Sequence, residues 1–463
     1  MRHLGNSLAS RDIASLVHPY TNLKAHQTEG PLVVMKGKGV HIYDEAGKEY
    51  IEGMAGLWCA SLGFDEQRLA DAAQAAMGKL GFYHMFAHKS HEPGIELAER
   101  LLAMAPVPMS KVFFGNSGSE ANDTAIKLVW YYNNALGRPD KKKIISRQRA
   151  YHGVTIASAS LTGLPANHAD FDLPIKNIIH TDAPHYYKGA QPGESEEQFA
   201  TRLADNLENL ILKEGPETCA AFFAEPVMGA GGVVVPPKTY FEKIQAVLKK
   251  YDLLFVCDEV ICGFGRTGNM FGTQTFDLKP DMIVVAKALS AAFLPISGLM
   301  ISERIYQAMV KESEKIGTFG HGFTYSGHPV CAAVAVETLK IYQERDIVSH
   351  VRKVMAPFQK EFRALANEDF IGEVRGVGLI GALEFVADKA TKRGFKPPGA
   401  VGRYFYKRAE EAGLITRNLV DSIALCPPLI INEAEIGEMF CRMRKAVAET
   451  QAWIRKEKID AAA

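Results

Sequence analysis

The chain has 463 residues, of which 53 are basic and 53 are acidic, so its formal net charge is zero. A neutral chain has no electrostatic footprint for nucleic acid or for an anionic membrane. No apolar run reaches the length of about 18 residues that a membrane span requires. The length exceeds that of a typical single core and predicts two or more lobes.

The N-terminus and the cysteines favour a cytoplasmic protein. The opening sequence MRHLGNSLASRDIASLVHPY lacks the apolar core of an export signal. The seven cysteines are scattered and show no CxxC spacing, which predicts reduced and mostly buried thiols. Residues 1–30 are expected to form a partly helical arm, either packed on a partner subunit or without a fixed position.

After this arm, residues 32–52 alternate in polarity between Gly-containing turns, which predicts a small antiparallel meander. A helix is expected over Asp65–Leu80. Trp58 and Phe86 lie in loop-like contexts on either side of it. Large aromatic side chains usually belong to a core, but loops also carry binding sites, so both interpretations stay open.

The segment KVFFGNSGSEAND at residues 111–123 indicates a strand followed at once by a helix. Ser117 and Glu120 have the spacing of a capping box. Gly118 and Ser119 then provide the first backbone N–H groups of the helix, which form an anion site together with the helix dipole. The alternative is a plain capped helix without a ligand.

A strand, a loop and a helix follow over residues 142–163, and Tyr151 lies where the loop meets the helix. Its ring suits stacking on a flat heterocycle, although an ordinary surface tyrosine is the simpler interpretation. Residues 167–198 are rich in loops. The expected elements after them are a helix over Phe199–Lys213, a strand over Cys219–Ala224 that ends on Glu225, and a helix over Tyr240–Lys250.

Two apolar runs in the middle of the chain end on opposite charges. Leu253–Cys257 is followed by Asp258, and Met282–Ala286 is followed by Lys287. Short apolar runs of this kind are typical of a parallel sheet covered on both faces, where ligands bind at the carboxyl ends of the strands. A pyridoxal phosphate site needs this pair, because a lysine binds the aldehyde and a carboxylate faces the pyridinium nitrogen. A surface lysine is the alternative for Lys287 taken alone.

The alternation of strands and helices over residues 110–300 predicts an α/β protein with a largely parallel, doubly wound sheet. After residue 302 the pattern becomes α+β. Helices are expected over Val330–Gln343, Ile347–Ala366, Val401–Ala412 and Glu433–Trp453, and short strands over Glu373–Arg375, Leu379–Phe385, Leu414–Thr416 and Ser422–Leu425. The expected domains are residues 1–60 (arm and part of a small domain), 61–325 (large domain) and 326–463 (C-terminal small domain).

Two GxGxxG strings, at residues 263–268 and 376–381, do not fit a dinucleotide fingerprint. The first lacks the helix that must follow, and the second continues as a strand. The sequence contains no HExxH motif and no Cys/His metal spacing, so we expect no metal site.

The motifs SGSEAND, YHG, AEPVMGAGG, DEVICGFGRTG, the strand-end Lys287 and HGFTYSGHP occur in this order. Together they resemble the class III aminotransferases of pyridoxal phosphate fold type I. Within that family, MAGLW, HGFTYSGHP and the arginine in GLITRNL resemble the omega-aminotransferases of the amine:pyruvate type. The resemblance covers essentially the whole chain. It implies pyridoxal phosphate as cofactor, a large domain with a mostly parallel seven-stranded sheet, and a smaller α+β domain built from both chain ends.

The resemblance also implies roles for the motif residues around the cofactor. The phosphate is expected at Gly118 and Ser119, and Thr324 is expected to reach the phosphate of the other subunit's cofactor. The ring is expected between Tyr151 and Val260. Asp258 would face the ring nitrogen with Glu225 close behind it, and Lys287 would be the Schiff-base lysine.

For the substrate, the resemblance implies a pocket lined by Tyr20, Leu57, Trp58, Phe86 and Tyr151. Arg417 matches the mobile arginine that binds the carboxylate of the keto acid and swings out for amines without one. Lys89 stands where some relatives carry arginine at the pocket edge, which leaves the acceptor open.

The expected activity is transfer of an amino group from a primary amine or omega-amino acid to a keto acid, with pyruvate giving alanine, in a homodimer or a dimer of dimers. A decarboxylating transaminase or an aminomutase would use the same site. A nicotinamide oxidoreductase, based on the GxGxxG strings, is a distant alternative, and a non-catalytic binding protein is the least favoured.

Overall fold

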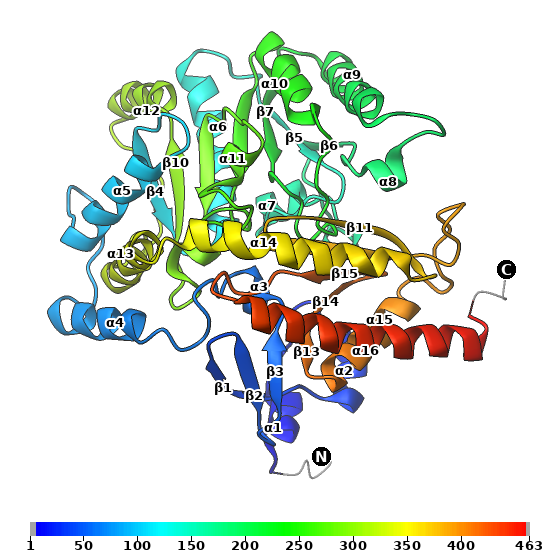
Figure 1. The fold of residues 1–463 in the computed structure, drawn as a ribbon. Coiled ribbons are helices and arrows are strands. Elements are labelled where there is room, and N and C mark those ends of the chain that lie inside the picture. Colours follow the sequence, from blue (N-terminus) through cyan, green and yellow to red (C-terminus); the bar gives the residue numbers. More distant parts are fainter. Residues whose placement is uncertain (1–5, 460–463) are drawn as a thin grey trace.

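A seven-stranded sheet lies at the centre of the computed structural model, which describes residues 6–459 (Figure 1). Its strand order is β4-β10-β9-β8-β7-β5-β6. Only β10 runs antiparallel to its two neighbours, and the other pairs are parallel. The strands are β4 (Lys111–Gly115), β5 (Lys143–Arg147), β6 (Ile178–Thr181), β7 (Cys219–Ala224), β8 (Leu254–Asp258), β9 (Met282–Val285) and β10 (Ser297–Ile301). The mostly parallel α/β sheet that we expected is confirmed.

Both faces of this sheet are covered, which explains why its central strands are apolar throughout. Phe222 and Phe255 belong to the apolar cluster on one face, and their neighbours Phe223 and Val256 belong to the cluster on the other. This alternation follows from the two-residue period of a strand. The helices of this part are α4 (Gln67–Lys79), α5 (Glu92–Met104), α6 (Gly118–Ala135), α7 (Ile156–Leu161), α8 (Tyr186–Gly189), α9 (Glu196–Glu214), α10 (Tyr240–Lys250), α11 (Gly272–Thr275), α12 (Glu303–Ile316) and α13 (Pro329–Glu344).

The two ends of the chain share a small sheet of order β1-β2-β3-β13. The antiparallel meander of β1 (Val34–Lys38), β2 (His41–Asp44) and β3 (Glu49–Glu52) is confirmed, and β13 (Leu414–Ile415) joins β3 in parallel. The helices α1 (Leu8–Ser15), α2 (Leu23–Glu29) and α3 (Ala55–Trp58) accompany it. The expected arm is thus partly helical from Leu8 on, and residues 1–5 lie outside the described residues.

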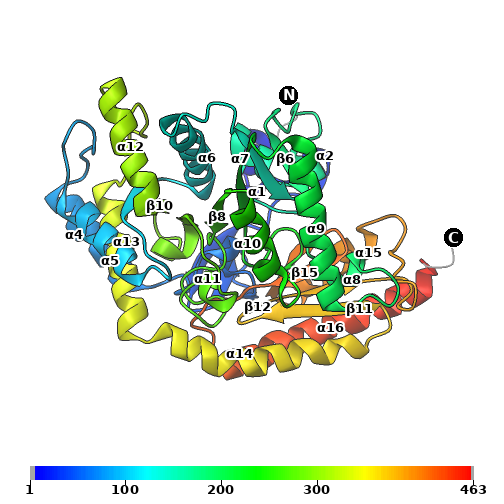
Figure 2. The same cartoon turned by 90° about the horizontal axis from the view of Figure 1, so that it is seen from above.

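A second small sheet has the order β11-β12-β15-β14. Its strands are β11 (Ile371–Val377), β12 (Ile380–Phe385), β14 (Arg417–Leu419) and β15 (Ser422–Leu425), and its helices are α14 (Ile347–Ala364), α15 (Ala400–Glu411) and α16 (Glu433–Glu457). α14 and α16 run side by side (Figures 1 and 2). The expected smaller α+β domain is therefore present. α13 packs against α4 and α5, and the boundaries at residues 60 and 325 stay predictions.

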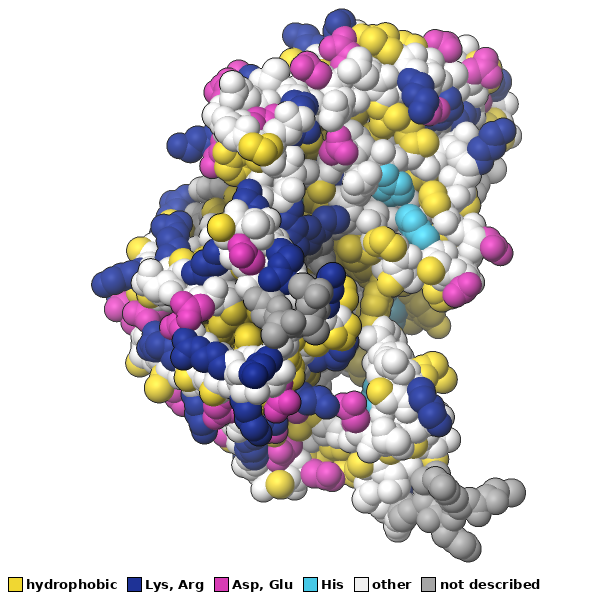
Figure 3. Space-filling model, turned by 90° about the vertical axis from the view of Figure 1, so that its right-hand side faces the viewer, with side chains coloured by type: hydrophobic (Ala, Val, Ile, Leu, Met, Phe, Trp, Pro, Cys, Tyr) yellow, Lys and Arg dark blue, Asp and Glu magenta, His cyan; other side chains and the backbone are white. Residues whose placement is uncertain are grey.

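The surface of the molecule is hollowed on the face shown in Figure 3, where hydrophobic side chains and Lys and Arg side chains surround the hollow. No helix among residues 6–459 combines the length and the apolar character that a membrane crossing requires.

Candidate active site

The carboxyl ends of the central strands bring four predicted site residues to one cavity. Asp258 is the last residue of β8, and Lys287 opens a 3₁₀ turn (Lys287–Ser290) just after β9. Glu225 follows β7, and Tyr151 lies in the loop after β5. All four line a cavity of about 1080 Å³. The expectation that parallel strands would deliver these groups to one sheet edge is confirmed.

Three N–H donors hold the Asp258 carboxylate. Nδ2 of Asn122 and Nδ1 of His152 donate to Oδ2, each over 2.8 Å, and the backbone N–H of Val260 donates to Oδ1 over 3.0 Å. Asn122 also donates to the His152 carbonyl (2.8 Å), which ties α6 to the loop that carries Tyr151. Such donors favour an ionised carboxylate and fix its direction.

Asn122 and His152 are positioning residues that sequence reasoning did not assign. Both lie inside motifs that drew attention for other residues: Asn122 follows the helix start in SGSEAND, and His152 follows Tyr151 in YHG. The available signal was a polar side chain, Asn122, near the start of α6 on a face that is otherwise apolar.

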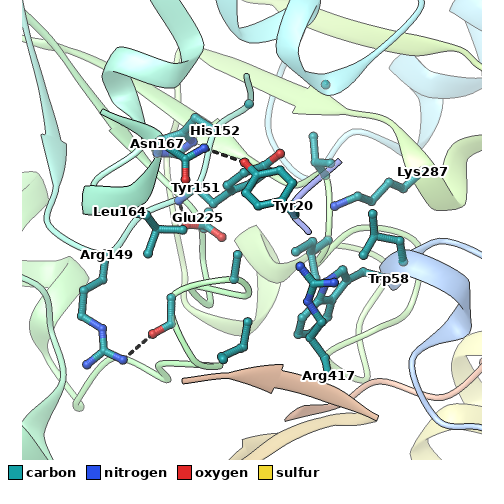
Figure 4. Close-up of a pocket in the computed structure, with 18 of the residues that line it drawn as sticks. Tyr20, Trp58, Arg149, Tyr151, His152, Leu164, Asn167, Glu225, Lys287 and Arg417 are labelled. Atoms are coloured by element: carbon teal, nitrogen blue, oxygen red, sulfur yellow. Dashed lines mark hydrogen bonds between the residues drawn. The ribbon is translucent and has the colours of Figure 1, made fainter. Parts of the chain in front are cut away.

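The Lys287 side chain points into the cavity (Figure 4) and makes no hydrogen bond or ion pair within residues 6–459. Burial lowers its pKa below the ordinary value for lysine, because a charged amine is poorly solvated there. The backbone of Lys287 has a φ of 51°, a left-handed conformation that non-glycine residues rarely adopt and that occurs preferentially at functional sites.

The start of α6 has the features of an anion site. The Ser117 hydroxyl accepts from the Glu120 N–H (3.2 Å), as in a capping box. The reciprocal contact differs, because Glu120 accepts from the backbone and side chain of Asn116 rather than from Ser117. The backbone N–H groups of Gly118 and Ser119 make no hydrogen bond within the described residues and remain available to a ligand.

Little space separates the start of α6 from the opposite wall. A Cβ added at Gly118 would lie 3.1 Å from Cγ2 of Val260, so this position favours glycine. Val260 and Tyr151 both line the cavity. They provide an aliphatic and an aromatic surface for a flat ring.

The Glu225 side chain stabilises two loops of the cavity wall through hydrogen bonds. Its carboxylate accepts from the backbone N–H of Tyr151 (3.0 Å) and from that of Gly229 (2.9 Å). Burial raises the pKa of Glu225 and also that of the Tyr151 phenol. Glu225 lines the cavity, where its carboxylate holds the Tyr151 backbone; its expected place close behind Asp258 stays a prediction.

The substrate side of the cavity is more apolar. Trp58, Leu57 and Tyr20 line it. Tyr20 accepts a hydrogen bond from Asn167 and lies edge-on to Tyr151, with ring centroids 6.4 Å apart (Figure 4). Arg417, the first residue of β14, lies next to Trp58 in this view. Its guanidinium has no hydrogen bond or ion pair within residues 6–459, so it is free to bind an anion.

Phe86 and Thr324 do not line this cavity in the single chain. They belong to neighbouring surface segments: Phe86 is 44% exposed, and its ring lies 2.9 Å from where a Cβ at Gly322 would be. The expected place of Phe86 in the substrate pocket is therefore not met within the single chain, and the role of Thr324 at the other subunit's cofactor stays a prediction.

The residues present fit pyridoxal phosphate. Free N–H groups at a helix start suit its phosphate, the Tyr151 face suits its ring, the Asp258 carboxylate suits a protonated ring nitrogen, and the unpaired Lys287 amine suits its aldehyde.

Comparisons with known proteins agree with this geometry. The family described as Aminotransferase class-III matches residues 23–447. A curated relative from Solanum lycopersicum, gamma aminobutyrate transaminase 3, chloroplastic, is 51% identical over 455 residues, which cover 97% of this chain and 87% of the relative.

Two solved structures are also similar. The omega transaminase from Pseudomonas jessenii in complex with PMP has a TM-score of 0.96 and 54% identity, covering 97% of this chain and 99% of that one. A transaminase with L-Ala has a TM-score of 0.91 and 59% identity, covering 91% of this chain and all of the other. The chain belongs to the class III aminotransferases, and it is a pyridoxal phosphate-dependent transaminase of fold type I.

Proposed function

We propose that this transaminase is an omega-aminotransferase, which moves the amino group of a primary amine or omega-amino acid to a keto acid, with pyruvate as acceptor and alanine as product. The observation that carries the proposal is the unpaired Arg417 guanidinium in a pocket otherwise lined by Trp58, Leu57 and Tyr20. Such a pocket accepts an apolar amine and still offers one bidentate partner to a carboxylate.

The similar proteins support this choice of substrates. The Pseudomonas jessenii protein is an omega transaminase, and the second structure contains L-Ala, the amino acid that corresponds to pyruvate. The tomato relative is named for gamma aminobutyrate, an omega-amino acid. We therefore include gamma-aminobutyrate among the donors to be tested.

Each residue around the cofactor has a separate role. Gly118 and Ser119 would bind the phosphate through backbone N–H groups, and Tyr151 and Val260 would flank the ring. Asp258, oriented by its three donors, would keep the ring nitrogen protonated, while Glu225 holds the loop of Tyr151 in place. When bound, pyridoxal phosphate supplies an aldehyde for the substrate amine and a ring that accepts an electron pair.

Lys287 moves the proton. Its buried amine has a lowered pKa, so a larger fraction is neutral and able to accept a proton at physiological pH. Nζ takes the proton from the substrate carbon that bears the nitrogen. The buried Trp58 ring limits the access of water on this side of the cavity.

Arg417 distinguishes the two half-reactions. It binds the carboxylate of the keto acid, and it turns away from Trp58 when the substrate has no carboxylate. Replacing it in Arg417→Leu is expected to lower kcat/KM for pyruvate by about tenfold or more, the worth of a charge-assisted bidentate contact. The kcat/KM for an amine without a carboxylate should change far less. Equal losses for both substrates in steady-state assays would contradict the role.

We also propose that two copies complete each site. Phe82, Tyr83, Phe86 and Tyr325 expose aromatic rings around the loop of Thr324, and an exposed apolar patch of this kind marks a protein interface. In a dimer, Phe86 and Thr324 would reach the pocket of the partner. A cytoplasmic location remains a proposal that rests on the free cysteines, whereas the tomato relative is named chloroplastic.

A further inference from the structure

We propose that Arg149 forms a second anion subsite in the same cavity, which selects substrates carrying a carboxylate far from the reacting nitrogen or carbonyl. The substrate classes are dicarboxylic keto acids and omega-amino acids. This inference rests on the proposed function and adds a second recognition point to Arg417.

Arg149 is placed at the cavity by its backbone. It lies two residues before Tyr151, in the loop after β5, and its φ of 67° is left-handed. Its N–H donates to the Gly163 carbonyl over 2.8 Å. This arrangement directs the side chain to the cavity end opposite Lys287 (Figure 4). A non-glycine residue in this conformation costs free energy, and such strain is concentrated at functional sites.

The guanidinium of Arg149 contacts neutral acceptors only. Nη2 donates to the Gly231 carbonyl (2.6 Å), and Nη1 lies 3.1 Å from Nδ1 of His185. Because arginine can only donate, Nδ1 of His185 is the acceptor. Nε2 of His185 then carries the proton and donates to Glu373 over 2.8 Å. His185 is therefore neutral, in agreement with a pKa that burial lowers.

Arg149 consequently carries a charge without a carboxylate partner within residues 6–459. A guanidinium has five N–H donors, and the contacts to Gly231 and His185 use two of them. An arginine that is half-buried and unpaired is unusual, because a buried charge is normally matched. The unused donors suit a planar carboxylate from a ligand.

The surrounding network supports an excess of positive charge. Arg375 pairs with Glu373 (2.6 Å) and Glu384 (2.9 Å), and Lys188 pairs with Glu384. This network thus contains two carboxylates, those of Glu373 and Glu384. It contains three cations, Arg149, Arg375 and Lys188.

Asp421 is a further acid that lines the cavity, but both of its carboxylate oxygens already accept hydrogen bonds. Its two oxygens accept from the backbone N–H groups of Gly399 (2.7 Å) and Gly402 (2.9 Å), at the start of α15. Asp421 forms no ion pair with Arg149 within residues 6–459.

Two unpaired arginines thus line one cavity. Arg417 lies beside Trp58, near Lys287, and Arg149 lies at the other end (Figure 4). A ligand with two carboxylates can engage both, whereas a monocarboxylate without an amino group engages Arg417 alone. An omega-amino acid has its amine at Lys287 and its single carboxylate at the Arg149 end. The Arg149 subsite therefore adds affinity for dicarboxylates and for omega-amino acids.

The test compares wild type with Arg149→Gln, which keeps an amide N–H donor but removes the charge, and with Arg149→Lys, which keeps the charge. Arg363→Gln, at an exposed position of α14, is the matched control. The first measurement is calorimetric binding of straight-chain dicarboxylates and of monocarboxylates of equal length to the cofactor-loaded protein. We expect Arg149→Gln to weaken dicarboxylate binding by about tenfold or more and to leave the binding of monocarboxylates without an amino group unchanged. We expect Arg149→Lys to restore part of the difference.

The second measurement is kcat/KM for straight-chain omega-amino acids and for alkylamines of equal length, with pyruvate held constant. We expect a loss in Arg149→Gln for the amino acids alone. Unchanged dicarboxylate binding, or equal losses for charged and uncharged substrates in both Arg149 variants, would overturn the subsite. Wild type that transaminates no amine with pyruvate would instead contradict the proposed function, so the two failures are distinguishable.

Discussion

At the scale of single residues, the site depends on how Asp258 is held. Its carboxylate receives N–H donors from Asn122, His152 and Val260, and these donors come from α6, from the loop after β5 and from its own loop. A negative charge fixed in this way stabilises a protonated ring nitrogen without reorganisation during the reaction.

Asp258→Asn tests this role, because it keeps the shape of the side chain and removes the charge. We expect the variant to bind pyridoxal phosphate but to react at least about 100-fold more slowly, the usual cost of losing a preorganised electrostatic partner. Single-turnover rates with an excess of amine measure the effect. A near-normal rate would show that the charge of Asp258 is not used.

The sequence identified the charged residues at the strand ends but not the groups that support them. Asp258, Glu225 and Lys287 each follow an apolar run, and a run of that kind has a local signature. The contacts of Asn122 with residues 152 and 258 join segments that are far apart in the chain. No local sequence pattern predicts such contacts. The same holds for the Arg149 guanidinium, whose hydrogen bonds depend on where Gly231 and His185 lie.

At the scale of elements, β3 ends on a buried acid close to the substrate side of the pocket. The Glu52 carboxyl accepts a hydrogen bond from the backbone N–H of Gly56, in the segment that carries Leu57 and Trp58. Burial raises the pKa of Glu52 to about 8 from an ordinary value of 4.5. The folded protein therefore holds this carboxyl in its protonated form at neutral pH.

The raised pKa of Glu52 determines how the free energy of unfolding changes with pH. A carboxyl with a raised pKa in the folded state contributes stability that is fully present below about pH 4.5 and is lost as the pH rises through about 8. Glu52→Gln keeps an acceptor for Gly56 but does not ionise. We expect its free energy of unfolding to decline less than that of wild type between pH 5 and pH 9, by on the order of a few kcal/mol.

Urea unfolding at several pH values measures this difference, and Glu314→Gln, at an exposed position of α12, is the control. Parallel pH dependence in wild type and Glu52→Gln would contradict the protonated state of Glu52.

Elements with a strong pattern were predicted closely, and those without one were not. The strand over Cys219–Ala224 and the helix over Tyr240–Lys250 have the predicted bounds, because one is apolar throughout and the other has an apolar stripe at helical spacing. β6 contains His180 and Thr181 and lies in a segment dominated by loops, so its four residues gave no distinct signal. The antiparallel direction of β10 is set by its pairing with β4 and β9, which depends on tertiary structure.

At the scale of the whole molecule, one chain does not present all of the predicted site residues to one cavity. Phe86 and Thr324 lie at the surface, next to Phe82 and Tyr325, whose ring centroids are 5.6 Å apart. A dimer that buries these rings would explain both their exposure in the single chain and the absence of Phe86 from its pocket.

Phe82→Glu tests the assembly, because a buried carboxylate in an apolar interface is costly. We expect wild type to have the mass of a dimer or of a larger even assembly in light scattering. The variant should shift towards the monomer and lose most of its activity in parallel. Leu212→Glu, at an exposed position of α9, controls for an added surface charge. A fully active monomer would contradict completion of the site by a second copy.

The most direct test of the whole account is the identity of the lysine that binds pyridoxal phosphate. The protein is incubated with the cofactor, reduced with borohydride and digested, and the peptides are analysed by mass spectrometry. The account predicts the reduced cofactor on Lys287, a visible absorbance band before reduction, and loss of both in Lys287→Ala but not in Lys360→Ala. Cofactor attached to a different lysine, or a Lys287→Ala variant that keeps its turnover, would contradict it.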